Sequence, residues 1–250
     1  MDPYGKSPLS QLLRQGILTA GALEDLRCHP EDPELLHRYR TGLRRLRSLL
    51  EAADLPEPGK QQWASQLKAH FRHTSPIRDL DVLHQFLLEW GQSAPVLEKA
   101  LEAQRHRQLK AFPLPPGIPG DPRIGEFLAW LEALPCMAAL IFSPGELLRE
   151  ALEILSGTPL PDPGDDEALH RLRIRVKKIR YMLETLPEPP PEARDLVVLQ
   201  DRLGEIRDLQ VSRQLALSLA GGAVPASFLG WLETRYRKAR DLWEQKISSS

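Results

Sequence analysis

The sequence of 250 residues predicts an all-α fold, and three observations support this prediction. Leucine and other apolar residues recur at three- and four-residue intervals, which is the spacing of one face of a helix. No comparable run alternates between polar and apolar residues, as a half-buried β-strand would. Proline clusters at residues 113–122, 159–163 and 187–191 separate the helical segments, because proline interrupts a helix.

In the first half of the chain, the apolar spacing predicts four helical segments. Apolar residues within 12–26 indicate an N-terminal helix, and those within 36–50 indicate a long second helix. Leucines within 80–88 indicate a third helix, and residues 101–112 belong to a long closing helix.

In the second half, signals for helix starts mark two further helices. Ser143, Pro144 and Glu146 have the spacing of an N-cap, a first-turn proline and the acid of a capping box. Asp165 and Asp166 precede the helix expected at residues 168–183, and acidic residues favour a helix N-terminus. Leu232 and Glu233 match Leu101 and Glu102 of the first half and indicate a second long closing helix.

The composition is that of a globular protein, with 42% hydrophobic and 27% charged residues. The longest apolar run, residues 135–142, is much shorter than the roughly 20 residues that cross a membrane. The first residues also lack the apolar core of a signal peptide. We therefore expect a soluble cytoplasmic protein with no membrane association.

Cysteine and histidine spacing gives no support to a metal centre. Cys28 and Cys136 are the two cysteines, and neither belongs to a CxxC motif or a Cys/His cluster. We expect two ordinary buried thiols and no disulfide framework, metal site or cofactor.

The net charge of −1 hides a very uneven distribution of charge. Residues 35–50 contain five arginines, residues 168–183 contain six Arg or Lys, and neither segment contains an acid. The other 218 residues contain 22 basic and 34 acidic side chains. Positive charge concentrated in this way on an acidic protein indicates a polyanionic partner.

The two basic segments belong to an internal repeat. Five residues of the first segment recur 133 residues later with every spacing retained. The matching pairs are His37 with His170, Arg40 with Arg173, Arg44 with Lys177, Arg45 with Lys178, and Arg47 with Arg180. A second string, residues 77–82, recurs at 206–211, and a third, weaker echo follows in the closing helices. The shared order predicts two homologous halves, residues 1–118 and 119–250, with pseudo-symmetric helical bundles.

One face of each basic helix carries a stripe of positive charge. At about 100° per residue, four of the repeated positions fall within roughly 80° of one another. The first basic stripe consists of His37, Arg40, Arg44 and Arg47, and the second basic stripe consists of His170, Arg173, Lys177 and Arg180. Leucines occupy the neighbouring sector, so each stripe is expected to border the core at the lip of a groove. Arg45 and Lys178 lie on the far flank and extend the basic surface.

A basic helix face is most often a solvated surface, but the repeat favours polyanion binding. Like charges three and four residues apart lower helix stability unless an anion neutralises them. Solvation alone does not require the same four offsets twice, nor the absence of acids from both segments. Arginine donates in pairs to phosphate oxygens, and lysine supplies a compact charge.

The two histidines at the start of the stripes have alternative possible roles, and two arginines outside the stripes are further candidates for anion binding. His37 and His170 either form hydrogen bonds, at the helix entrance or at the seam between the two halves, or contact phosphate, more strongly when protonated. Arg78 and Arg207, in the second repeated string, are expected to be further anion contacts.

Neighbouring acids and aromatics are expected to have structural roles. Asp79 and Asp208 are expected either to cap the next helix or to pair with an arginine of a stripe. The five tryptophans occupy helical apolar positions and do not alternate with the stripes, so base stacking on them is not expected.

The repeated motifs resemble the CHAD family, the conserved histidine α-helical domain. The similarity lies in His-x-x-Arg-x3-Arg-Arg-x-Arg at 37–47 with Arg-Asp-Leu-Asp-Val-Leu at 78–83, and in His-x-x-Arg-x3-Lys-Lys-x-Arg-Tyr at 170–181. It extends over about residues 7 to 247. The resemblance implies a single all-helical domain whose two pseudo-symmetric bundles surround a basic groove or pore.

The same resemblance implies binding of inorganic polyphosphate and association with polyphosphate granules or granule-associated proteins. The implied ligands are the repeated basic residues, to which Arg78 and Arg207 are added from the second string. These two stripes are expected to form one continuous channel that favours long phosphate chains.

Three alternatives differ in class from polyphosphate binding, and one of them is a structural scaffold that tethers granules or partner proteins through its acidic exterior. A nucleic-acid-binding protein could use the same cations, although base-stacking aromatics and base-edge readers are not apparent. A polyphosphatase or phosphotransferase would need groups that activate water or a phosphate, and no clustered carboxylates or Gly-rich phosphate loop are evident. We therefore expect a binding protein and not an enzyme.

Overall fold

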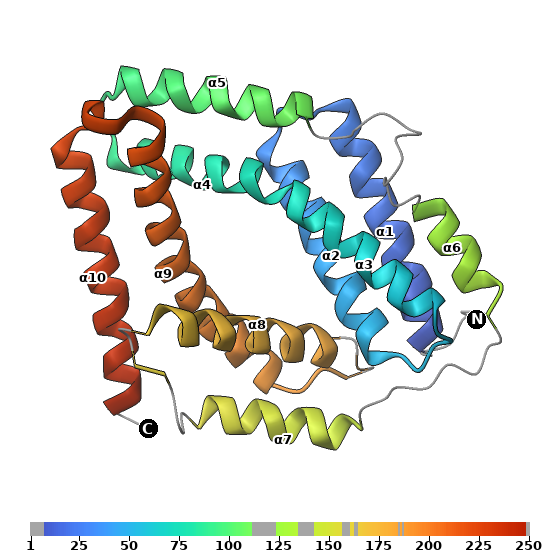
Figure 1. The fold of residues 1–250 in the computed structure, drawn as a ribbon. Helices are drawn as coiled ribbons and strands as arrows, with labels where there is room; N and C mark the ends of the chain where they lie inside the picture. The colour runs from blue at the N-terminus through green and yellow to red at the C-terminus, as the bar shows by residue number, and fades with distance from the viewer. Residues whose placement is uncertain are drawn as a thin grey trace. The chain divides into compact units, whose positions relative to one another are not determined.

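The computed structural model describes residues 8–111, 124–134, 143–156, 161–162, 165–184, 186 and 188–248. These residues form helices and contain no β-strand (Figure 1), which confirms the all-α prediction. None of the helices in this described part of the chain is long and apolar enough to cross a membrane.

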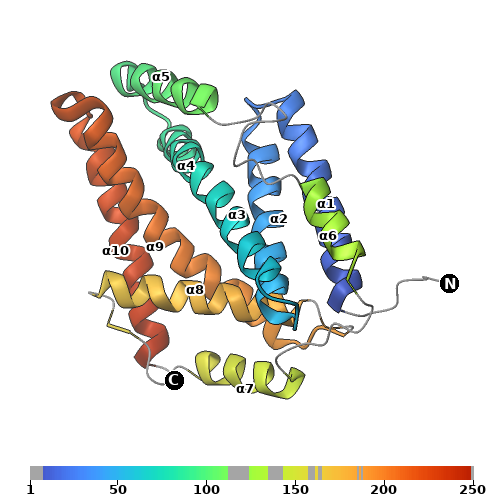
Figure 2. The same cartoon turned by 45° about the vertical axis from the view of Figure 1, so that its right-hand side comes forward.

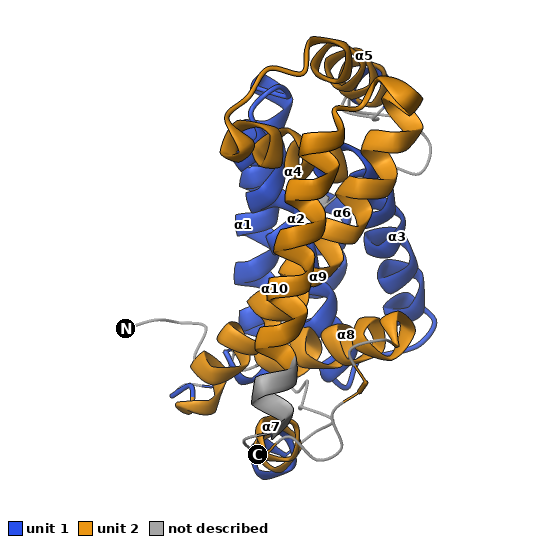
Figure 3. Cartoon of the chain, turned by 90° about the vertical axis from the view of Figure 1, so that its left-hand side faces the viewer, with its two compact units in different colours: residues 1–78, 109–147, 181–189 blue, residues 79–108, 148–180, 190–250 orange. Residues whose placement is uncertain are grey.

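Contacts divide the chain into two compact units (Figure 3). Unit 1 comprises residues 1–78, 109–147 and 181–189, and unit 2 comprises residues 79–108, 148–180 and 190–250. Each unit therefore contains segments from both sides of residue 118. The division into halves at that residue describes the sequence repeat and stays a prediction.

Unit 1 contains helices α1 (Pro8–Cys28), α2 (Pro33–Ala52), α3 (Gly59–His73) and α6 (Ile124–Glu132). Helix α1 packs against α2 and α6, and α2 also packs against α3 (Figure 2). The core of this unit is built from leucines and aromatic residues, among them Leu12, Leu26, Leu36, Leu43, Leu46, Leu50, Trp63, Leu67 and Phe127.

Local features explain how α2 is placed in unit 1. Asp32 caps its N-terminus by accepting a 2.8 Å hydrogen bond from the Glu34 amide, and Pro33 begins the helix. A Cβ at Gly42 would lie 2.7 Å from Thr19 Oγ1, so glycine permits the close approach of α1 and α2.

Unit 2 contains helices α9 (Glu192–Ala220) and α10 (Ala226–Ser248), which pack against one another. The short 3-10 helix η1 (Gly221–Ala223) lies between them in the chain. Most of α8 (Asp166–Leu183), α7 (Pro144–Leu155), α5 (Pro95–Ala111) and α4 (Ser75–Trp90) also belongs to this unit.

Arg235 of α10 connects three helices of unit 2. Its guanidinium forms ion pairs with Glu89 of α4 and with Glu205 of α9, the latter at 3.0 Å. The Arg235 Cζ also lies 5.2 Å from the ring centroid of Phe86 and 5.0 Å from that of Trp231.

Both helix-start predictions in the second half are confirmed. Ser143 and Glu146 form the reciprocal bonds of a capping box, at 2.9 and 3.2 Å, before α7. Asp165 Oδ1 accepts a 2.9 Å hydrogen bond from the Ala168 amide at the start of α8.

One sequence expectation about burial, that of buried thiols, was wrong for Cys28. Cys28 is an exposed free thiol because it is the last residue of α1, where the helix leaves the core; Cys136 lies outside the described residues.

Candidate functional site

The first basic stripe lies along α2, at the boundary between the core of unit 1 and the solvent. The neighbouring Leu36, Leu43, Leu46 and Leu50 are each at most 1% exposed. Within the stripe Arg40 is buried, Arg44 and Arg47 are half-buried, and His37 is exposed. The predicted placement of the stripe beside the core is therefore confirmed.

Arg40 is held by the turn between α3 and α4. Its guanidinium donates to the Phe71 carbonyl at 3.1 Å, to Thr74 Oγ1 at 2.7 Å and to Ser75 Oγ at 3.2 Å. These bonds satisfy a cation that is only 5% exposed. Arg40 therefore joins α2 to the α3–α4 turn and adds a buried positive charge to the stripe.

Two of the predicted arginines of α2 have acidic neighbours. Arg47 pairs with Glu51 at 3.6 Å within the same helix, and Arg45 pairs with Glu184 at 3.5 Å. The Arg45 Cζ also lies 6.0 Å from the ring centroid of Tyr181. Their positive charge is partly neutralised by these acids, and their role as anion ligands stays a prediction.

Arg78, from the start of α4, lies within electrostatic reach of His37. Partial burial of the imidazole lowers the pKa of His37 below its ordinary value of 6.5, and the charge of Arg78 lowers it further. Arg44 and Arg40 act in the same direction, and Glu34 opposes them. The structure thus gathers a neutral imidazole and three cations in unit 1; we name His37, Arg40, Arg44 and Arg78 the first cluster.

A second cluster of similar composition, with a lysine in place of one arginine, lies in unit 2. Burial lowers the pKa of His170 below 6.5, and the neighbouring charges of Arg173, Arg207 and Lys177 lower it further. We name His170, Arg173, Lys177 and Arg207 the second cluster. Arg173 and Lys177 are half-buried, whereas His170 and Arg207 are exposed.

Of the two remaining predicted ligands of α8, Arg180 lies closer to the core. Arg180 is 8% exposed, and its Nε donates a 2.9 Å hydrogen bond to Gln200 Oε1 of α9. Lys178 is half-buried. Arg180 therefore joins α8 to α9, much as Arg40 joins α2 to the α3–α4 turn, and both residues stay predicted ligands.

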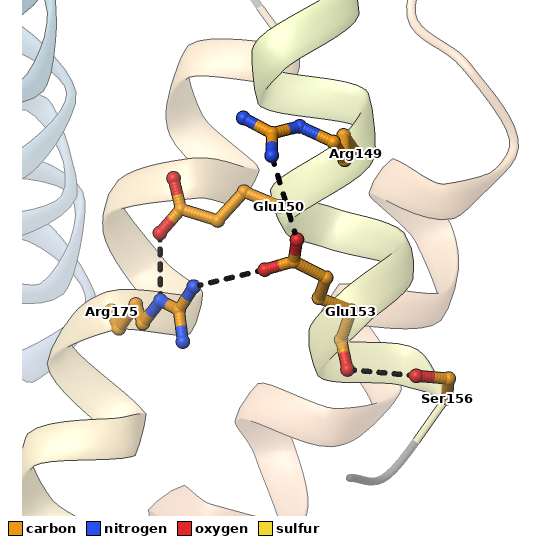
Figure 4. Close-up of polar contacts among 5 residues, drawn as sticks. All are labelled: Arg149, Glu150, Glu153, Ser156 and Arg175. Atoms are coloured by element: carbon orange, nitrogen blue, oxygen red, sulfur yellow. Dashed lines mark hydrogen bonds and ion pairs between the residues drawn. The ribbon is translucent and has the colours of Figure 1, made fainter.

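Arginines on the other faces of α8 are neutralised by acids (Figure 4). Arg175 Nε lies 2.7 Å from Glu150 Oε1, and its Nη2 lies 3.8 Å from Glu153 Oε2, so it joins α8 to α7. Arg171 pairs with Glu167 at 2.7 Å. The acids that the sequence places around the basic helix thus pair with arginines outside the second basic stripe.

Asp79 and Asp208 do not cap helices. Asp79 is the fifth residue of α4, and Asp208 lies in the middle of α9, so neither precedes a helix start. The capping prediction is wrong because the helix continues through both positions. Pairing of these acids with an arginine of a stripe stays a prediction.

Phe71 is the residue of the site that sequence reasoning missed. Its ring centroid lies 4.1 Å from Arg40 Cζ and 4.9 Å from Arg44 Cζ. In the sequence it is an ordinary apolar position of a helix, and only the packing of α3 against α2 brings it under the guanidinium groups.

The two clusters are suited to binding phosphate groups. Guanidinium and ammonium groups donate charge-assisted hydrogen bonds to phosphate oxygens.

Among the described residues, no three His, Cys, Asp or Glu side chains lie close enough to hold a metal ion.

Comparisons with known proteins agree with this fold. The model of the CHAD domain family matches residues 17–217. The crystal structure of the CHAD domain from the plant Ricinus communis is similar over 96% of this chain and 92% of that one, with a TM-score of 0.66 and 24% identity. PptA from Streptomyces chartreusis is similar over 95% and 93%, with a TM-score of 0.54 and 18% identity. No curated protein matches the chain.

Proposed function

The chain belongs to the CHAD domain family, and from this premise and the two clusters we propose that it binds inorganic polyphosphate. We propose binding without catalysis, and association with polyphosphate granules in the cytoplasm. The observation that carries the proposal is the duplication of one arrangement, in which three cations lie around a partly buried histidine whose pKa is lowered by burial and by their charges.

A bound phosphate chain would relieve the electrostatic cost of these clusters. Like charges one helical turn apart repel each other, and partial burial strengthens the repulsion. Polyphosphate carries a negative charge on each repeating unit, so one ligand neutralises several cations and releases counterions. Affinity should therefore fall steeply as salt concentration rises.

Polyphosphate fits the clusters better than nucleic acid does. Base-directed binding of single strands uses exposed aromatic rings on which bases stack. In the described part of unit 1, the aromatic ring beside the first cluster is Phe71, and guanidinium groups already lie over it. We therefore expect polyphosphate to displace RNA and DNA, and not the reverse.

The proposal is tested by fluorescence anisotropy with labelled long-chain polyphosphate at several salt concentrations. Unlabelled long-chain polyphosphate, tripolyphosphate, single-stranded RNA and duplex DNA serve as competitors. Tight, salt-sensitive binding displaced by long polyphosphate alone supports the proposal. Equal displacement by nucleic acid would instead support a nucleic-acid-binding protein. Release of phosphate over time would contradict binding without catalysis.

A pair of double variants tests whether the clusters are the sites. Arg44→Gln with Lys177→Gln removes one cation from each cluster and should weaken polyphosphate binding at least tenfold, because charge-assisted bonds are lost. The matched control is Arg38→Gln with Arg171→Gln, which lowers the net charge equally. Those arginines lie outside the stripes and pair with Asp25 at 2.5 Å and Glu167 at 2.7 Å. Equal weakening in both double variants would contradict a role specific to the clusters.

A further inference from the structure

The Phe71 ring lies against two arginines of the first basic stripe, Arg40 and Arg44. We propose that Phe71 is a positioning residue that holds the Arg44 guanidinium ready for a phosphate. This inference rests on the proposed function. It assigns a role to a residue that carries no charge and makes no contact with phosphate itself.

Arg40 and Arg44 are restrained in different ways. Arg40 donates three hydrogen bonds to the α3–α4 turn, so its position depends little on the Phe71 ring. Arg44 makes no hydrogen bond or ion pair with any described residue, and its contact is with the ring, 4.9 Å from the centroid. The ring is therefore the group that restrains Arg44.

The ring also reduces the cost of placing two cations one turn apart. Guanidinium groups at positions i and i+4 repel each other, whereas the negative face of an aromatic ring attracts each of them. A stacked arginine has already lost much of its rotamer freedom, so less is lost when it binds phosphate.

Unit 2 contains a different solution at the corresponding position. At the 129-residue offset that relates residues 77–82 to 206–211, Phe71 corresponds to Gln200. The Gln200 amide accepts a hydrogen bond from Arg180 and offers no aromatic face. The two repeats therefore differ at this position.

The test begins with Phe71→Leu, which removes the aromatic face and keeps an apolar side chain of similar size. Binding of labelled long-chain polyphosphate should weaken about two- to fivefold, the range of an exposed cation–π contact. Phe71→Tyr should restore wild-type affinity because it keeps the ring. The backbone carbonyl that holds Arg40 is retained in both variants.

Phe86→Leu is the matched control. Phe86 has the same kind of contact, with Arg235 Cζ 5.2 Å from its ring centroid, but neither residue belongs to a cluster. Polyphosphate affinity should not change in this variant. Equal weakening by Phe86→Leu would show that loss of any such ring acts through general stability, which would overturn the inference.

A double-mutant cycle separates positioning from packing. If Phe71 acts through Arg44, Phe71→Leu should have little further effect on affinity in an Arg44→Gln background. Undiminished loss in that background, or unchanged affinity in the single variant, would overturn the inference while wild-type binding keeps the proposed function intact. Absence of polyphosphate binding by the wild-type protein would overturn the proposed function itself.

Discussion

At the scale of single residues, the two cluster histidines differ from free imidazoles because cations surround them. Burial and the neighbouring arginines and lysine lower the pKa values of His37 and His170 below 6.5, so both rings are neutral at neutral pH. A bound polyanion would screen those cations and favour the protonated rings. Binding should therefore be accompanied by proton uptake.

The resulting prediction concerns the pH dependence of affinity. Between pH 7.5 and 5.5, at fixed ionic strength, polyphosphate affinity should rise as pH falls, by less than tenfold per pH unit for each histidine. His37→Gln with His170→Gln should flatten this dependence, as measured by anisotropy at both pH values. A double variant with the wild-type pH dependence would exclude proton uptake at these two rings.

The arginines in and near the clusters also differ in whether they form ion pairs with acids. Arg38, Arg171 and Arg175 pair with acids on the outer faces of the basic helices. Arg44 makes no ion pair with any described residue, and Arg78 and Arg207 likewise make none. Counting charges in the sequence does not reveal this division, because acids from α1 and α7 supply part of the neutralisation.

At the scale of helices, a buried polar contact joins α2 to α3. The Tyr39 hydroxyl lies 2.7 Å from His70 Nδ1, and His70 is 3% exposed. Burial, followed by the charges of His73 and Arg27, lowers the pKa of His70 from 6.5 to about 4. The folded protein therefore holds a neutral imidazole that the unfolded chain would protonate in mild acid.

The sign of the linkage predicts a loss of stability in acid. The stabilising contribution is complete above pH 6.5 and is lost progressively as pH falls to about 4, by up to about 3 kcal/mol. In urea unfolding followed by circular dichroism, wild-type stability should fall more between pH 7 and pH 5 than that of His70→Gln. Parallel pH dependences in the two proteins would argue against a neutral buried His70.

Helix boundaries followed local signals where side chains alone determine them. The Ser143–Glu146 capping box and the Asp165 cap formed as their spacing predicts. The prediction that Asp208 is a helix cap was wrong because Asp208 lies inside α9, a continuous helix of 29 residues. Packing of α9 against α10 stabilises that continuous helix, and no local sequence signal reports it.

At the scale of the whole molecule, one chain carries two clusters, one in each compact unit. A phosphate chain long enough to engage both would bind the second cluster intramolecularly and gain effective concentration. Affinity should therefore rise in a step as chain length increases, beyond the gradual gain expected from added charge. Titrations with size-fractionated polyphosphates would give the length at which the step occurs.

Single variants provide the control for this prediction. Arg44→Gln or Lys177→Gln alone should reduce the step while leaving affinity for tripolyphosphate within about twofold, because a short chain can use the intact cluster. A smooth dependence on chain length, unaffected by either variant, would mean that the clusters bind phosphate chains independently.

The sequence by itself determined the helical class, the family and the two basic stripes, because helical periodicity and residue spacing are local properties of the chain. Arg40, Arg44 and their repeats could be proposed as anion ligands from spacing alone. Tertiary structure decided which cations the fold holds by hydrogen bonds, ion pairs or ring contacts. It placed the Arg40 guanidinium against the α3–α4 turn, Glu184 beside Arg45 and the Phe71 ring beside Arg44. These contacts join residues far apart in the chain, and their formation depends on how whole helices pack.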